Sequence, residues 1–192
     1  MSLRERKKLA AWRAISDAAL RLFEEHGYEA TTIEQIAAAA DVSRATFFNY
    51  FAGKEAVLFD QDPEARARWR ARLESRDPGE SLWDALTTVM LDVSEGLRER
   101  MPLMRRLKTQ SPALAQASRA SGDQLRTDLR TSILAQPRSG DPMSATLQLN
   151  LALAASATAY ESWRADEDFD TYLLRLRQCL EHVGAGVESL TP

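Results

Sequence analysis

The stretch from Thr31 to Leu58, TTIEQIAAAADVSRATFFNYFAGKEAVL, carries the clearest structural pattern in the chain. It predicts two short helices joined by a tight turn, followed by the start of a longer helix. Thr32 is suited to cap the first short helix, because Gln35 follows three residues later as in a capping box. Asp41 is suited to the turn, because a short polar side chain tolerates left-handed backbone angles. Ser43 is suited to cap the second short helix.

In the second short helix, the aromatic residues predict which side is buried. Phe47 and Phe51 are four residues apart, so they share one face and can anchor the helix in a core. The remaining residues form an outward surface of Arg44, Ala45, Thr46, Phe48, Asn49 and Tyr50. This arrangement is typical of a helix-turn-helix whose second helix enters the major groove of DNA.

The same residues resemble the amino-terminal domain of the TetR/AcrR family of bacterial transcriptional regulators. The matching positions are Thr31-Thr32-Ile33, Ile36-Ala37, Ala40, Val42-Ser43, Thr46-Phe47-Phe48-Asn49-Tyr50-Phe51, Lys54-Glu55 and Leu58, with Ala18-Ala19-Leu20, Leu22-Phe23 and Gly27-Tyr28 upstream. Two positions depart from the family pattern. Asp41 stands where Gly is usual, and Phe48 stands where Tyr is usual. The second departure removes a hydroxyl that family members point at a phosphate.

The rest of the chain also predicts helices, and no strand-like alternation persists. Apolar residues recur at helical spacing in several segments, which favours an all-α fold of about nine helices. The resemblance divides the chain into two parts. Residues 1–52 are expected to form the helix-turn-helix DNA-binding domain, and residues 53–192 a helical effector-binding and dimerisation domain.

The composition excludes several classes of protein. The chain has 192 residues, 44% of them hydrophobic, and a net charge of −3, which suits an ordinary globular protein. Its single cysteine excludes an internal disulfide and a cysteine-built metal site. No apolar run is long enough to span a bilayer, and no apolar segment follows the charged amino terminus as in a signal peptide. We therefore expect a cytoplasmic protein without a membrane partner.

Local charge matters more than the acidic total for a DNA-binding role. Near the amino terminus Glu5 stands among the basic residues Arg4, Arg6, Lys7, Lys8 and Arg13. We expect this basic arm to follow the phosphate backbone or reach a groove, the alternative being a solvated and partly frayed terminus. A second basic run covers residues 66–76. Its spacing of two places arginines all round a helix, which favours a solvated helix surface over a DNA contact.

Positions at helix ends suggest roles in DNA binding. The amino ends of the two short helices, at Thr31, Thr32 and Ser43, are suited to present backbone amides to phosphates. Arg44 fits guanine, because the two acceptors of guanine match the guanidinium fork. A loose phosphate contact is the alternative for this residue. The family resemblance implies that Lys54 contacts a phosphate.

The other residues of the outward surface have distinct chemistry. Ala45 and Thr46 are suited to touch a thymine methyl group, and Asn49 to read adenine or hold a phosphate. Tyr50 is expected to meet the DNA backbone through its hydroxyl. Phe48, without a hydroxyl, is expected to pack on a sugar.

The last two predicted helices are interpreted as a dimer interface, because in the resembling family they pair with their copies as a four-helix bundle. The expected interface residues are Ala152, Ala155, Ala159, Leu173, Leu176, Leu180, Val183 and Val187. The alternative is that both stripes face the chain's own core, which holds for part of every helix. A homodimer would match a palindromic operator in double-stranded DNA.

Members of the resembling family hold a small molecule in the carboxy-terminal domain, and its binding releases the operator. We expect a small apolar or amphipathic effector here, because Met and aromatic residues suit adaptable apolar pockets. The candidate lining residues are Trp83, Leu86, Met90, Met101, Met104, Tyr160 and Trp163. The alternative is that they are plain core. Repression is the default mode of the family.

Two other classes of function compete with this interpretation. For an enzyme, the chain offers two histidines, His26 and His182, and one thiol, Cys179. Cys179 and His182 are three residues apart on the final helix, but two ligands do not make a metal site. The sequence has no Gly-rich phosphate loop, nucleophile elbow or HExxH motif, so we expect no enzyme, metal or cofactor. The other alternative is an all-helical protein-interaction adaptor that does not use its helix-turn-helix.

Overall fold

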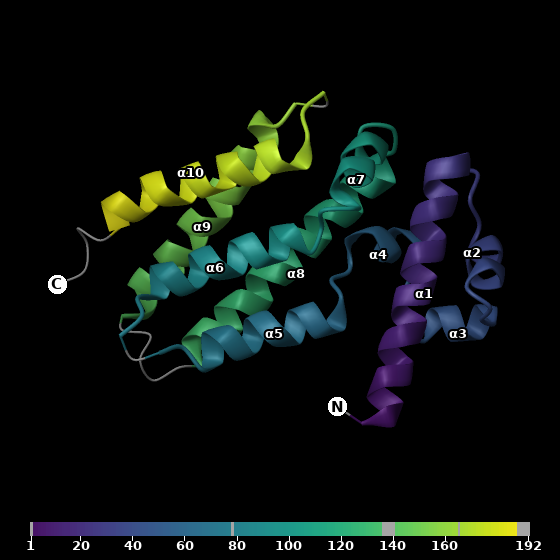
Figure 1. The fold of residues 1–192 in the computed structure, drawn as a ribbon, viewed down its shortest axis with the longest axis horizontal. Coiled ribbons are helices and arrows are strands. Elements are labelled where there is room, and N and C mark those ends of the chain that lie inside the picture. Colours follow the sequence, from purple (N-terminus) through teal and green to yellow (C-terminus); the bar gives the residue numbers. More distant parts are fainter. Residues whose placement is uncertain (1, 78, 136–140, 165, 188–192) are drawn as a thin grey trace. The chain divides into compact units, whose positions relative to one another are not determined.

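The computed structural model describes residues 2–77, 79–135, 141–164 and 166–187, except for the side chain of Val187. These residues form ten α-helices and no strand, which confirms the all-α prediction (Figure 1). The helices are α1 (Leu3–His26), α2 (Ile33–Ala39), α3 (Arg44–Phe48), α4 (Lys54–Phe59), α5 (Pro63–Glu74), α6 (Leu82–Glu95), α7 (Met101–Lys108), α8 (Pro112–Leu134), α9 (Pro142–Ser162) and α10 (Phe169–Val187). None of the described helices combines the length and apolarity needed to cross a lipid bilayer.

Prolines explain where the helices differ from the expected ones. The long helix expected after the helix-turn-helix is two helices, because Pro63 cannot continue a preceding helix and instead begins α5. Asp62 supports this start, since its Oδ1 accepts the backbone N–H of Glu64 at 2.8 Å. The sequence predicts that Pro102 ends or kinks a helix. It lies in the first turn of α7, where its missing N–H removes no helical hydrogen bond.

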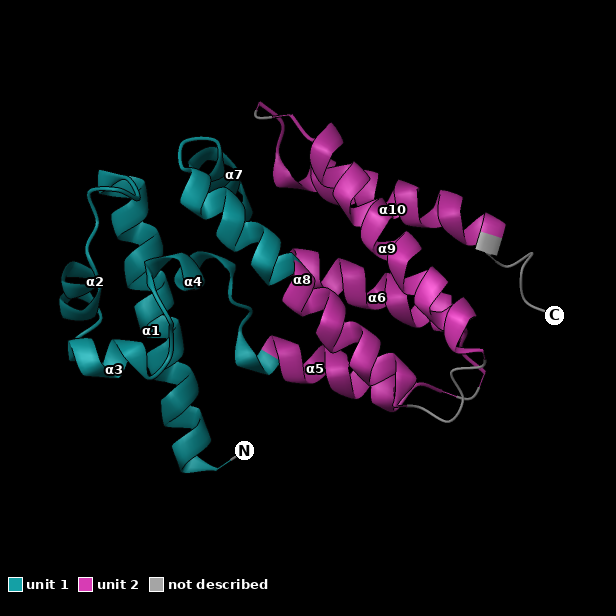
Figure 2. Cartoon of the chain, turned by 180° about the vertical axis from the view of Figure 1, so that it is seen from behind, with its two compact units in different colours: residues 1–64, 99–122 teal, residues 65–98, 123–192 magenta. Residues whose placement is uncertain are grey.

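The chain divides into two compact units (Figure 2). Unit 1 comprises residues 1–64 and 99–122, and unit 2 comprises residues 65–98 and 123–192. Unit 1 therefore extends beyond the predicted domain of residues 1–52. The reason is that apolar side chains of α4, α7 and α8 join the core that α1, α2 and α3 form.

Within unit 1, α1 lies between the pair α2 and α3 on one side and α4 on the other (Figures 1 and 2). Aromatic rings fill the centre of this core. The ring centroids of Trp12 and Phe51 are 5.4 Å apart, and those of Phe47 and Phe51 are 5.7 Å apart. Leu103 and Leu114 bring α7 and α8 into the same core. The aromatic contacts fix the direction of α3 on the surface of unit 1.

Within unit 2, α10 packs along α9, and both pack against α6. An ion pair between Arg66 of α5 and Asp128 of α8 joins two further helices. Where α9 ends and α10 begins, the rings of Trp163, Phe169 and Tyr172 pack together. Unit 2 thus has a hydrophobic core of its own.

Candidate nucleic-acid interface

The turn between α2 and α3 has the geometry that its residue types predict. Asp41 adopts a φ of 54°, in the left-handed region, which confirms the expectation for this residue. The next residue, Val42, donates its N–H to the carbonyl of Ala37 at 2.9 Å. At the other end of α2, Thr32 Oγ1 accepts the N–H of Gln35 at 3.2 Å, while Gln35 Oε1 accepts the N–H of Thr32 at 2.8 Å. The predicted capping box is therefore present.

α3 turns one face into the core and the other to solvent. Phe47 is 0% exposed and Phe51 is 1% exposed. Ser43 caps the helix, because its Oγ accepts the N–H of Thr46 at 3.0 Å. On the opposite side, Arg44, Ala45, Phe48 and Asn49 are exposed, whereas Thr46 and Tyr50 are half-buried. The outward surface that the sequence predicts is thus accessible to a partner.

Arg44 is held in a defined position on this surface. Its Nε donates to Oε1 of Glu34, on α2, at 2.8 Å. Its guanidinium carbon lies 4.9 Å from the centroid of the Phe48 ring. The sequence interpretation missed both contacts, because Phe48 was expected to pack on a DNA sugar and Glu34 was given no role.

The amino end of α2 differs from the sequence interpretation. Thr31 is 1% exposed, and its Oγ1 donates to the carbonyl of Gly27 at 2.8 Å. Its N–H donates to the carbonyl of Tyr28 at 3.3 Å, and the N–H of Thr32 is bonded to Gln35. Both amides are thus bonded within unit 1, and a phosphate contact at the amino end of α2 stays a prediction. These residues position α2.

Lys54 also points into unit 1. Its Nζ donates to the carbonyls of Tyr28 at 2.8 Å and Thr31 at 3.1 Å, and it lies 4.1 Å from the centroid of the Tyr28 ring. The hydroxyl of Tyr28 donates to Glu55, and burial together with this bond raises the pKa of Tyr28. Two of the three ammonium donors are thus engaged, and Lys54 braces the segment between α1 and α2 against α4. Its contact with a phosphate stays a prediction.

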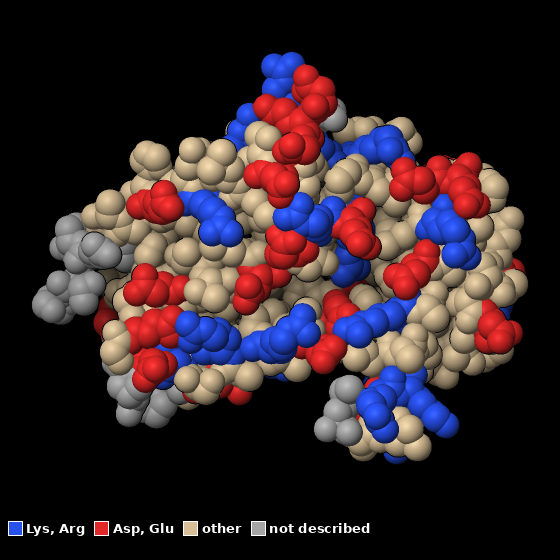
Figure 3. Space-filling model, in the orientation of Figure 1, with Lys and Arg blue, Asp and Glu red and all other residues tan. Residues whose placement is uncertain are grey.

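A solvent-open groove lies between the amino end of α1 and the carboxyl end of α3. Its lining residues are Leu3, Arg4, Lys7, Lys8, Asn49 and Tyr50. Basic side chains gather at this end of α1 (Figure 3). Lys and Arg beside an amide and a phenol are the side-chain types that contact phosphates in protein–DNA complexes. The sequence could not reveal the groove, because its two sides come from different helices.

The basic arm is helical from Leu3 onward, and its side chains from Leu3 to Lys8 are exposed. Ser2 caps α1, and its Oγ accepts the N–H of Glu5 at 3.2 Å. Oε2 of Glu5 in turn accepts the N–H of Ser2 at 2.6 Å, and this bond lowers the pKa of Glu5. The capping box therefore fixes the helix that carries one wall of the groove.

Most of the expected dimer-interface residues lie in the core of unit 2. Six of them are between 0% and 8% exposed, namely Ala152, Ala155, Ala159, Leu173, Leu176 and Leu180. Val183 is half-buried, and the side chain of Val187 lies outside the described residues. Side chains buried within one chain are not available to a second copy, so we correct their interpretation as an interface. The outward faces of the same helices carry Met143, Leu147 and Leu174, exposed by 77%, 47% and 56%.

The expected effector-pocket residues come from both units. They are divided between unit 2, with Trp83, Leu86, Met90, Tyr160 and Trp163, and unit 1, with Met101 and Met104. Within unit 2, Trp83 lies against Gly184, whereas Trp163 packs on Tyr172. These two places are about 18 Å apart along α10. Trp83 and Trp163 therefore lie in separate parts of the core of unit 2, and a pocket lined by the other residues stays a prediction.

The sequence analysis did not predict a role for two buried hydroxyl groups in unit 2. Within the described residues, Thr87 Oγ1 on α6 and Ser132 Oγ on α8 are buried without a hydrogen-bond partner. Ser132 is 2% exposed. A buried hydroxyl of this kind is costly unless a ligand or water satisfies it. No sequence pattern distinguishes these two residues from the other hydroxyl side chains of the chain.

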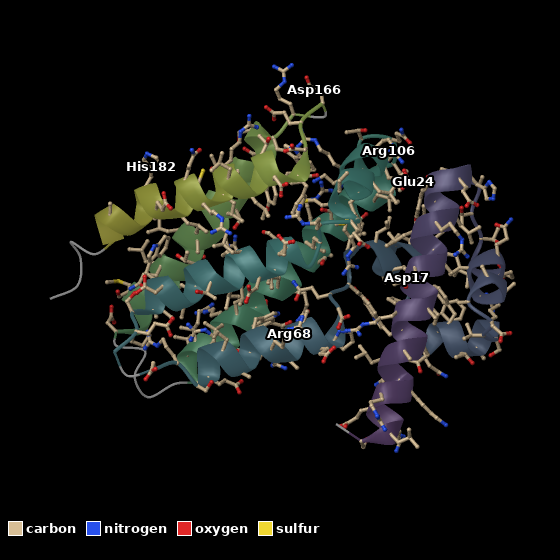
Figure 4. The ribbon with its side chains drawn as sticks, viewed as in Figure 1. Asp17, Glu24, Arg68, Arg106, Asp166 and His182 are labelled. Atoms are coloured by element: carbon tan, nitrogen blue, oxygen red, sulfur yellow. The ribbon has the colours of Figure 1, made fainter. Side chains whose placement is uncertain are left out.

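The residues that raised the metal alternative, His182 and Cys179, lie in different surroundings on α10. His182 lies on the outer side of α10 (Figure 4), and its Nδ1 is 2.6 Å from the carbonyl oxygen of Gln178. Cys179 is a half-buried free thiol. In the part of the chain that the structure describes, no three His, Cys, Asp or Glu residues gather to hold a metal ion.

An all-α chain whose helix-turn-helix exposes its second helix, beside a basic groove, is a DNA-binding protein. Residues 15–60 match the family described as "Bacterial regulatory proteins, tetR family". The chain is 30% identical over 184 residues to MftR of Mycobacterium tuberculosis, a regulator named for mycofactocin biosynthesis, and the match covers 92% of this chain and 90% of MftR. It is 31% identical over 110 residues to the HTH-type transcriptional repressor KstR of Rhodococcus jostii, covering 56% and 50%.

Solved structures show the same fold. A protein from Syntrophomonas wolfei described as a TetR-family transcriptional regulator superposes with a TM-score of 0.62 at 18% identity, covering 91% of this chain and 95% of that chain. FadR of Bacillus subtilis, solved with stearoyl-CoA, superposes with a TM-score of 0.50 at 17% identity, covering 91% and 98%. The chain therefore belongs to the tetR family of bacterial regulatory proteins. It is a DNA-binding transcriptional regulator.

Proposed function

We propose that the chain binds a palindromic operator as a homodimer, represses transcription there, and is released by a small apolar or amphipathic effector. One observation carries the DNA-binding part of the proposal. Arg44, Ala45 and Asn49 are exposed on α3, while Phe47 and Phe51 hold the helix in the core. A regulator of operator DNA acts in the cytoplasm, where a bacterial chromosome lies.

The proposed docking places α3 in the major groove. The guanidinium of Arg44 reads guanine, and the methyl groups of Ala45 and Thr46 contact a thymine methyl. Asn49 reads adenine or holds a phosphate. The groove formed with Lys7 and Lys8 follows the adjacent phosphates, and these contacts fix the register of the helix without reading sequence. Tyr50, which lines the same groove, adds a hydroxyl to this backbone contact.

The proposed dimer uses the outward faces of α9 and α10. Met143 and Leu147 are exposed four residues apart on α9, and Leu174 is exposed on α10. Exposed apolar side chains on neighbouring helices favour burial against another protein surface. A twofold axis through this surface would pair identical patches and present two copies of α3 to two half-sites.

The proposed effector site lies inside unit 2. The unpartnered hydroxyls of Thr87 and Ser132 are the polar groups that an amphipathic ligand would engage within an apolar core. An acyl chain with a carbonyl group has this chemistry, and stearoyl-CoA is the ligand named for the B. subtilis FadR structure. For release, the effector must bind more tightly to the state that does not fit the operator.

The decisive experiment is selection of double-stranded DNA from a random library by the full chain, followed by band-shift titration of the selected operator. Arg44→Ala should cost about 1–3 kcal/mol at one base position. Lys7→Ala should weaken all sequences alike and make the salt dependence shallower. Equal weakening of all sequences by Arg44→Ala would contradict base reading by this residue.

Two outcomes would favour the other classes of function. Failure to select any DNA would favour a helical protein-interaction adaptor. We propose no enzymatic activity, because MftR and KstR are named as regulators. Turnover of a bound small molecule by the purified chain would overturn that part of the proposal.

A further inference from the structure

Four side chains of α2 and α3 form a connected row that runs from the core of unit 1 to its surface. Phe47, which is 0% exposed, contacts Phe48 edge-on, with ring centroids 5.5 Å apart at 85°. Phe48 is 42% exposed and lies under the guanidinium of Arg44. Glu34 approaches the same guanidinium from α2. The row therefore links the rigid core to the residue that is best suited to read a base.

The ion pair at the end of this row adds little to folding stability. The side chains of Arg44 and Glu34 are 64% and 63% exposed, and exposed pairs are weakened by solvent and salt. Its effect is on orientation. A free arginine side chain samples many rotamers, whereas Arg44 is confined between a carboxylate and an aromatic face.

The geometry also selects which donors meet the DNA. The bond to Glu34 uses the single Nε–H of Arg44. The two Nη groups provide the fork that matches O6 and N7 of guanine. Glu34 further places a negative charge near the DNA surface, which lowers the affinity for DNA of any sequence.

We propose that Glu34 and Phe48 are positioning residues that give the chain its discrimination for one G·C pair in each half-site. This inference rests on the proposed function, and specifically on base reading by Arg44. Phe48, at a position where the family usually has Tyr, supports the reading side chain and does not contact a phosphate. Glu34 lowers the affinity of the chain for DNA in general and raises its selectivity for the G·C pair.

The test measures affinity for the selected operator and for each single-base-pair substitution of it, at one fixed salt concentration. Glu34→Ala should bind unrelated DNA more tightly and lose roughly tenfold or more in discrimination at the position that Arg44→Ala affects. Glu34→Gln keeps an oxygen acceptor for Arg44 without the charge. It should also bind unrelated DNA more tightly but retain more of the discrimination. Phe48→Ala should lose discrimination, and Phe48→Tyr should keep it.

Glu24→Ala is the matched control. Glu24 forms an exposed ion pair with Arg106 at 2.9 Å, between α1 and α7, with side chains 61% and 53% exposed (Figure 4). The substitution changes the net charge equally and should leave the discrimination unchanged. Thermal melting followed by circular dichroism checks that the variants fold.

The outcomes separate the two proposals. If Arg44→Ala weakens every base position alike, the base-reading part of the proposed function fails. If Arg44→Ala acts at one position while Glu34→Ala and Phe48→Ala leave discrimination there unchanged, this inference alone is overturned. Loss at that position in Glu34→Ala, but not in Glu24→Ala, supports it.

Discussion

Hydrophobic spacing predicted the buried side of both α3 in unit 1 and α10 in unit 2, but it predicted what covers that side only for α3. In α3 and the turn after it, the residues predicted to be buried, Phe47 and Phe51, are buried. Of the residues predicted to face outward, four are exposed, and Thr46 and Tyr50 are half-buried. In α10 the leucines predicted to face a partner, Leu173, Leu176 and Leu180, are buried within the chain. Spacing identifies a buried face, but it does not identify whether the chain or a second copy covers that face.

The largest effect is expected from removing the anchor of α3. Phe47→Ala leaves a cavity in the core of unit 1 and should lower the free energy of unfolding by about 3–5 kcal/mol. Denaturant unfolding measures this loss, and a band shift should show that operator binding falls with it. Phe48→Ala is the matched control, because Phe48 is 42% exposed, and it should cost less than about 1 kcal/mol. Equal losses would contradict the distinction between the inward and outward faces of α3.

The second largest effect is expected from a substitution of Leu174, on the outward face of α10. Leu174→Arg places a charge on the proposed interface and should yield a monomer with operator affinity lowered about 100-fold or more, equivalent to roughly 2.7 kcal/mol. Sedimentation and band shifts measure the two consequences. Leu134→Arg, on α8, changes another exposed leucine and should leave the dimer intact. A dimer that survives Leu174→Arg would contradict the proposed interface.

Features that depend only on residues close together in the chain could be predicted well from the sequence. The caps at Thr32 and Ser43 and the left-handed angle of Asp41 follow from local chemistry, so residue type and short spacing were sufficient. Lys54 and Thr31 could not be placed in this way. Their partners are backbone carbonyls, and the choice between those carbonyls and a phosphate depends on the fold.

Unit 2 was harder to predict because α9 carries apolar residues on more than one side. Ala152 is buried while Leu147 is exposed on the same helix. Small and aliphatic residues therefore supply both the core and the outward surface. The effector-pocket residues stay a prediction for a related reason, since Met and aromatic side chains fill cores as readily as they line pockets.

Two glycines on α10 offer a smaller test of packing in unit 2. A Cβ added at Gly184 would lie 2.5 Å from Nε1 of Trp83, whereas one added at Gly186 meets nothing within 4 Å. Because Trp83 is buried, Gly184→Ala should lower the free energy of unfolding by about 1–3 kcal/mol. Gly186→Ala should be neutral or raise it by up to about 1 kcal/mol through helix propensity. Stabilisation by Gly184→Ala would show that the end of α10 is loosely packed.

The smallest effect is a pH dependence carried by one buried tyrosine in each unit. Burial and a hydrogen bond to Glu55 raise the pKa of Tyr28, and burial raises the pKa of Tyr172 while its bond to Ser94 acts in the opposite direction. In both cases the folded state favours the protonated phenol. This preference contributes fully to the free energy of unfolding below the ordinary tyrosine pKa of about 10. The contribution is lost as the pH rises through the pKa of the folded state.

The two units should differ in the size of this alkaline loss. Tyr28 donates to a carboxylate, which repels a phenolate, whereas the hydroxyl of Ser94 can donate to a phenolate at Tyr172. Tyr28→Phe should therefore flatten the alkaline fall in the free energy of unfolding more than Tyr172→Phe does, when each variant is compared with the unaltered chain at neutral pH and above about pH 10. A larger flattening in Tyr172→Phe would mean that burial in unit 2 outweighs the charge of Glu55 in unit 1.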